Sequence, residues 1–92
     1  MFTPTPKQEE VIQGFLLERY RQDKKWGKGT WQSPVHLKYI VLAEEFGEIA
    51  EAILNHDKDN LKEELIQVAA VCLKWLEAID SDPDDWDNHG NG

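Results

Sequence analysis

Apolar residues recur at helical spacing in three stretches of this chain. The first follows Thr5 and Pro6, where threonine suits the N-cap and proline suits the first helical position. Gln8 completes a capping box with Thr5. The pattern predicts a helix from Pro6 to a position after Lys24. Its apolar face is formed by Val11, Ile12, Phe15, Leu16 and Tyr20.

A second helix is predicted after a glycine-rich loop over residues 26–33. Ser33 and Pro34 are placed as its N-cap and first residue, and it runs to about Asn55. Gly47 in its middle costs about 1 kcal/mol relative to alanine, so we expect another helix or a ligand to approach closely there. The residues expected to face a core are Leu37, Ile40, Ala43, Phe46, Ala50, Ile53 and Leu54.

The third predicted helix runs from residue 61 to about 80, with Asn60 and Glu63 as a capping box. It is apolar nearly all round, so it must be buried on more than one side. Three helices from one short chain cannot easily cover it. We therefore expect an all-α fold, a compact antiparallel helical bundle completed by homo-oligomerisation as a homodimer or homotetramer.

The 92 residues suffice for one small helical domain over residues 1–81, followed by an acidic, flexible tail over residues 82–92. No apolar run is long enough to span a membrane. The lone cysteine, Cys72, and an N-terminus without a signal sequence favour a cytoplasmic location. A formal net charge of −8 argues against a nucleic-acid partner, because such proteins need a basic face.

Carboxylates are placed so that they converge. Glu45 and Glu48 are three residues apart on the second helix, and Glu64 and Gln67 are three apart on the third. Each pair shares a face of its helix, so antiparallel packing brings three carboxylates and one amide together. Like charges this close favour a hard divalent cation such as Mg²⁺. Glu44, Glu45 and Glu48 have no lysine or arginine four residues on, so a ladder of helix salt bridges does not explain them.

These segments resemble the MazG-like all-α nucleoside triphosphate pyrophosphohydrolases. Their motif is Glu-x-x-Glu, a spacer, and Glu-x-x-Asp. The first half is similar to Glu45-Phe46-Gly47-Glu48 and the second to Glu64-Leu65-Ile66-Gln67, with the resemblance covering residues 9 to 80. Gln67 departs from the family's aspartate; its amide oxygen can ligate a metal but carries no charge.

The resemblance implies cleavage of a nucleoside triphosphate, with dGTP or another purine deoxynucleotide among the candidates, into its monophosphate and pyrophosphate. It implies Mg²⁺, with Mn²⁺ as an alternative, held by Glu45, Glu48, Glu64 and, more weakly, Gln67. The same three glutamates are the predicted catalytic residues, together with Glu44. Glu44 either orients the attacking water or is simply solvated.

Substrate contacts are predicted from residue chemistry and from the resemblance. Cations suit the phosphates, and an aromatic ring suits the base, with Trp26 preferred over Trp31; a core role stays open for either tryptophan. His36 touches substrate or has a capping or surface role, and Lys74 binds phosphate or is a surface lysine with a buried stem. The predicted substrate-binding residues are Arg21, Lys24, Lys25, Trp26, Trp31, His36 and Lys74.

Two other functions stay open. Gln67 is compatible with a non-catalytic helical dimerisation or regulatory module that keeps the fold without the activity. Hydrolysis of phosphoribosyl-ATP, by enzymes that share this fold, is an enzymatic alternative.

Overall fold

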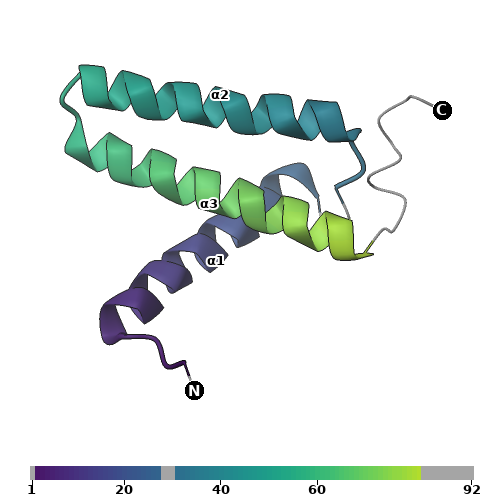
Figure 1. The fold of residues 1–92 in the computed structure, drawn as a ribbon, viewed down its shortest axis with the longest axis horizontal. Helices are drawn as coiled ribbons and strands as arrows, with labels where there is room; N and C mark the ends of the chain where they lie inside the picture. The colour runs from purple at the N-terminus through teal and green to yellow at the C-terminus, as the bar shows by residue number, and fades with distance from the viewer. Residues whose placement is uncertain (1, 28–30, 82–92) are drawn as a thin grey trace.

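The computed structural model describes residues 2–27 and 31–81, which form three helices and no strand (Figure 1). These are α1 (Pro6–Trp26), α2 (Val35–Leu54) and α3 (Lys58–Ser81). α2 and α3 lie antiparallel and side by side, and α1 packs on the opposite side of α3. Within the described ranges α1 and α2 do not contact each other. The all-α prediction is confirmed, whereas the predicted flexible tail lies outside the described residues.

The start of α1 is as predicted. The Gln8 N–H donates to the Thr5 hydroxyl at 3.1 Å, and the Thr5 N–H donates to the Gln8 side chain at 2.8 Å. This reciprocal capping box satisfies two donors that the first turn of a helix leaves without partners. At the other end, Gly27 has φ 93° and its N–H donates to the Asp23 carbonyl at 2.8 Å. A positive φ is open to glycine at little cost, so Gly27 ends the helix cleanly.

The predicted N-caps of the other two helices are wrong. α2 has Pro34, not Ser33, as its N-cap, and no side chain caps it. Pro34 keeps an extended ψ of 155°, so the helix begins one residue later at Val35. α3 begins earlier than predicted because the Asp57 carboxylate accepts a hydrogen bond from the Asn60 N–H at 3.0 Å.

The face of α2 that was predicted to be its core face is exposed in the single chain. All seven residues concerned are exposed: Leu37, Ile40, Ala43, Phe46, Ala50, Ile53 and Leu54. The buried residues of α2 are instead Lys38 and Ala52. The physical reason is that, among the described residues, α2 packs only on α3 and meets it through the stripe that carries Lys38, Glu45 and Ala52.

The buried apolar residues of the described chain are small, namely Ala52, Ala70, Val71 and Ala78. α1 is tied to α3 by Arg19, whose guanidinium contacts the Glu77 carboxylate at 2.7 Å and also pairs with Asp23. Arg19 is buried, and the hydrogen bonds to two carboxylates compensate for the loss of its hydration.

Gly47 does not mark a close approach within the chain. A Cβ placed there would meet no atom of the described residues within 4 Å. No other helix of the described chain therefore approaches this glycine, and the approach of a ligand stays a prediction.

Candidate metal centre

Three carboxylates converge where α2 faces α3. Glu45 and Glu48 come from successive turns of α2, and Glu64 comes from the second turn of α3. One oxygen of each lies within 4.8 Å of the others. The antiparallel packing of two Glu-bearing helix faces therefore produces the cluster that the sequence predicted.

Burial and mutual repulsion act strongly on this cluster. Glu64 is buried and Glu45 is half-buried, while Glu48 remains exposed. Burial, followed by interaction with the Glu48 and Glu45 carboxylates, raises the pKa of Glu64 to about 7. Burial, followed by the charge of Glu48, also raises the pKa of Glu45. In both residues burial and the neighbouring carboxylates disfavour the charged form.

A divalent cation fits this donor set. One carboxylate oxygen of Glu45 and one of Glu64 are buried with no hydrogen-bond partner in the part of the chain that the structure describes. Buried polar atoms without partners are rare, and carboxylate oxygens are the ligands that hard cations prefer. The three residues can therefore hold a metal ion, which would supply the missing positive charge.

Two other predicted residues are close in sequence to members of the cluster. Gln67 is half-buried one turn after Glu64 on α3. Glu44 is exposed, and its charge contributes to the raised pKa of Glu45. Their predicted roles, as a weaker ligand and as a residue that orients water, stay predictions.

A basic and aromatic cluster lies further along the α2–α3 interface. The ammonium of Lys74 is 5.0 Å from the centre of the Trp31 ring, and that of Lys38 is 5.7 Å from it. Trp75 meets Trp31 edge-on, with ring centres 6.5 Å apart and an interplanar angle of 74°. The structure thus brings together two of the predicted substrate residues, Lys74 and Trp31.

The other predicted substrate residues do not lie beside the carboxylates. Arg19 places the last turns of α1 beside Glu77, which is 13 residues, or about 20 Å along the helix, from Glu64. Four of the predicted residues belong to those turns, and a fifth is exposed at the start of α2. They are Arg21, Lys24, Lys25, Trp26 and His36.

In the α1 group, cations already contact neighbours within the helix. Arg21 pairs with Glu18 at 3.3 Å, and the Lys25 ammonium is 5.0 Å from the centre of the Trp26 ring. Trp26 is 70% exposed. This ring is therefore accessible from solvent, as a base-stacking surface needs to be.

Sequence reasoning missed two residues of this region. Lys38 is fully buried and lies on the stripe of α2 that includes Glu45, seven residues later. That spacing was a usable signal, because seven residues are nearly two full turns. Arg19 gave no such signal, because no local pattern predicts its distant partner Glu77.

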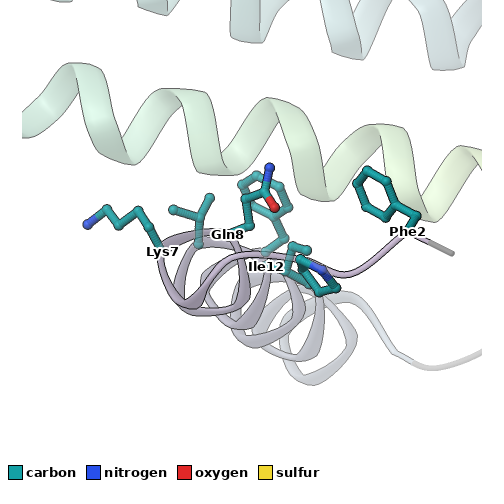
Figure 2. Close-up of a pocket in the computed structure, with 7 residues that line it drawn as sticks. Phe2, Lys7, Gln8 and Ile12 are labelled. Atoms are coloured by element: carbon teal, nitrogen blue, oxygen red, sulfur yellow. The ribbon is translucent and has the colours of Figure 1, made fainter.

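An apolar pocket lies elsewhere, between the first residues of the chain and the start of α1 (Figure 2). Its volume is about 330 Å³. None of the predicted site residues lines it. Its lining residues are Phe2, Pro4, Lys7, Gln8, Val11, Ile12 and Phe15.

Comparison with known proteins agrees with the sequence motif. A family model of the MazG nucleotide pyrophosphohydrolase domain matches residues 32–78, which are 47 of the 92 residues. The matched segment contains α2 and most of α3, and so all three carboxylates. No curated protein and no solved structure matches this chain. Among the described residues, no helix is long and apolar enough to cross a membrane.

Proposed function

This chain belongs to the MazG nucleotide pyrophosphohydrolase family, and we propose from this premise that it is a metal-dependent nucleoside triphosphate pyrophosphohydrolase. The observation that carries the proposal is the cluster of Glu45, Glu48 and Glu64, with two buried oxygens that lack partners among the described residues. Family membership supports nucleotide pyrophosphohydrolysis in general. The metal, the substrate and the residue roles are the proposed part.

In this proposal Glu45, Glu48 and Glu64 hold Mg²⁺ or Mn²⁺, and Gln67 contributes its amide oxygen. A bound divalent cation neutralises charge on phosphate oxygens and helps to activate water. Glu44 is exposed one residue from Glu45, where its carboxylate orients the attacking water by accepting a hydrogen bond.

The reaction adds water to the α-phosphorus and breaks the bond from that phosphorus to the oxygen that bridges to the β-phosphorus. The products are a nucleoside monophosphate and pyrophosphate. The protein must hold the triphosphate in line with the water and balance its charge. The carboxylates do this only through the cation, because without it they would repel the substrate.

The substrate is proposed to be a (d)NTP, with dGTP or another purine deoxynucleotide as the first to be tested. Trp26 offers an exposed ring for the base. The Lys25 ammonium lies against this ring, and Arg21 and Lys24 belong to the same last turns of α1. Within one chain these residues lie far from the carboxylates. The proposal therefore has them contact a substrate that is held by the carboxylates of a second copy.

A second copy also explains the exposed apolar residues. The apolar face of α2 is exposed over its whole length, and a homodimer or homotetramer would bury it. Ile40→Glu places a charge in the middle of this face. We expect sedimentation to show an oligomer for the wild-type chain and a smaller species for this variant. A wild-type chain that sediments as a monomer would contradict the proposed assembly.

Gln67 is the one observation that favours another function. The family motif has an aspartate at this position, and the loss of that charge fits a non-catalytic dimerisation or regulatory module. A cytoplasmic location and the phosphoribosyl-ATP alternative stay predictions from the sequence.

The test is pyrophosphate release from a panel of canonical and modified (d)NTPs and phosphoribosyl-ATP, with and without Mg²⁺ or Mn²⁺. Wild type is compared with Glu48→Gln and with Glu51→Gln, an exposed glutamate one turn further along α2. We expect metal-dependent release that Glu48→Gln abolishes and Glu51→Gln keeps. Folded wild-type protein that hydrolyses no triphosphate would refute the proposal and favour the regulatory module.

A further inference from the structure

The side of α1 that faces away from α3 carries an apolar stripe. Ile12, Leu16 and Tyr20 recur at every fourth residue, and Leu17 lies beside them. Each of these four side chains is 44–52% exposed. Among the described elements α1 packs on α3 alone, so no other helix of the described chain covers the stripe. Exposed apolar residues that gather on one helix face are typical of an interaction surface.

The α1 stripe is separate from the exposed apolar face of α2. α1 and α2 pack on opposite sides of α3 (Figure 1). A partner that buries the α2 face therefore leaves the α1 stripe in solvent. Burial of both faces needs two different interfaces.

Opposite charges stand at the two ends of the α1 stripe. Glu9 lies seven residues before Leu16, and Lys24 lies seven residues after Leu17. Seven residues are nearly two full turns, so each charge lies on almost the same side as the leucine that it is counted from. Both side chains are exposed, and neither forms an ion pair within the described ranges. The Lys24 ammonium is 5.2 Å from the centre of the Tyr20 ring, which holds this cation against the stripe.

This arrangement is complementary to itself. When a second α1 is turned end for end about the midpoint between Leu16 and Leu17, its acidic end faces the basic end of the first helix. A two-fold interface requires such a patch, because the same surface must serve both copies. Charge complementarity therefore indicates a second copy of this chain as the partner of the stripe.

We propose that the α1 stripe binds the α1 stripe of a second copy, with the two helices antiparallel about a two-fold axis between Leu16 and Leu17. Glu9 then pairs with the partner subunit's Lys24, and Lys24 pairs with the partner subunit's Glu9. The leucines of both copies meet at the axis. The interface thus has an apolar centre and one ion pair at each end.

The same pairing accounts for the apolar pocket at the start of α1. Ile12 belongs both to the stripe and to the lining of this pocket (Figure 2). In the antiparallel arrangement the partner subunit's Tyr20 lies opposite Gln13 and beside Ile12. Its ring therefore covers the rim of the pocket.

The pairing does not depend on the proposed activity. Together with assembly through the α2 face it gives a tetramer with two kinds of two-fold interface. It assigns Lys24 to the interface and leaves Arg21, Lys25 and Trp26 for the substrate.

Disulfide trapping tests the pairing and its direction. Leu16→Cys and Gln13→Cys are each made in a Cys72→Ser chain, oxidised and run on a non-reducing gel. In the antiparallel pair the two copies of position 16 lie next to the axis, whereas the two copies of position 13 are about 10 Å apart along it. A disulfide needs Cα atoms within about 7 Å, so we expect a covalent dimer from Leu16→Cys and none from Gln13→Cys. No dimer from Leu16→Cys, or equal dimer from both, would overturn the antiparallel pairing.

Charge exchange tests the ion pairs independently. Ile40→Glu is used as the background because it removes assembly through α2, and we expect this protein to sediment as a dimer. Glu9→Lys or Lys24→Glu should each weaken that dimer about tenfold at low salt, and the double exchange should restore it. Circular dichroism confirms that each variant is folded.

An Ile40→Glu protein that sediments as a folded monomer would refute the pairing, and a double exchange as weak as the single ones would refute the ion pairs. Both measurements are independent of turnover. A chain that forms the Leu16→Cys dimer and hydrolyses no triphosphate would keep the pairing and lose the proposed function.

Discussion

Replacing Glu64 by glutamine should stabilise the metal-free protein at alkaline pH while it removes metal binding. Glu64 is buried beside two other carboxylates, and its pKa is raised from the ordinary 4.5 to about 7. The folded state therefore keeps this proton at pH values where the unfolded chain has already lost it. Stability linked to this group is fully present below about pH 4.5 and is lost as the pH rises through about 7.

The size of the effect follows from the same shift. Each pKa unit corresponds to about 1.4 kcal/mol, so the change from 4.5 to about 7 is on the order of 3 kcal/mol above pH 8. Relaxation of the exposed Glu48 will reduce it, and we expect Glu64→Gln to gain between about 1 and 3 kcal/mol at pH 8.5. Glutamine keeps the shape of the side chain and removes only the charge. The gain should fall below about 1 kcal/mol at pH 5, where Glu64 keeps its proton in the folded state and only the unfolded chain has begun to lose it.

Urea unfolding in EDTA at pH 5, 7 and 8.5 measures this free energy, with the protein concentration held constant because assembly would add to it. Glu63→Gln is the control, since Glu63 is an exposed glutamate on the same helix. Added Mg²⁺ should stabilise wild type at pH 8.5 and leave Glu64→Gln nearly unchanged. If Glu64→Gln is no more stable than Glu63→Gln at pH 8.5, the carboxylates do not repel one another as described.

Three further changes test the fold. Arg19→Met should lower the free energy of unfolding in urea by about 2 kcal/mol, because it leaves Asp23 and Glu77 without their cation. Its control is Arg21→Met, at an exposed pair, which should lower it by less than about 0.5 kcal/mol. Equal losses would show that Arg19 does not join α1 to α3. Gly47→Ala should raise the free energy of unfolding by about 0.5–1 kcal/mol, since the added methyl group meets no atom of the chain; a loss would indicate that a second copy packs there. Asp57→Ala should lower the thermal midpoint, because it removes a helix cap worth about 1 kcal/mol, whereas Asn60→Ala should have little effect. A larger loss of thermal midpoint in Asn60→Ala than in Asp57→Ala would show that Asn60 is the cap.

Local chemistry made the helices and the three carboxylates predictable. The Thr5–Gln8 capping box begins α1 as expected, because a cap depends only on neighbouring residues. The three-residue spacing of Glu45 and Glu48 fixed their common face, and the helical period of α3 fixed Glu64. Antiparallel packing of two adjacent helices was then enough to bring the cluster together.

The orientation of α2 was not predictable from its apolar pattern. Hydrophobicity indicates which face avoids water, but it does not say whether this chain or another one covers that face. Within the chain, α2 turns Lys38 and Ala52 inward and leaves Ile40 and Phe46 exposed. Lys38 beside Trp31, and Arg19 beside Glu77, also depend on contacts between distant segments. A single-sequence pattern does not contain such contacts.

The most direct test of the metal centre is the anomalous diffraction of crystals soaked in Mn²⁺, collected near the manganese absorption edge. We expect a peak bounded by carboxylate oxygens of Glu45, Glu48 and Glu64, and we expect it to be lost in crystals of Glu64→Gln. Well-ordered wild-type crystals with no peak between these three side chains, or with manganese bound only elsewhere, would contradict it.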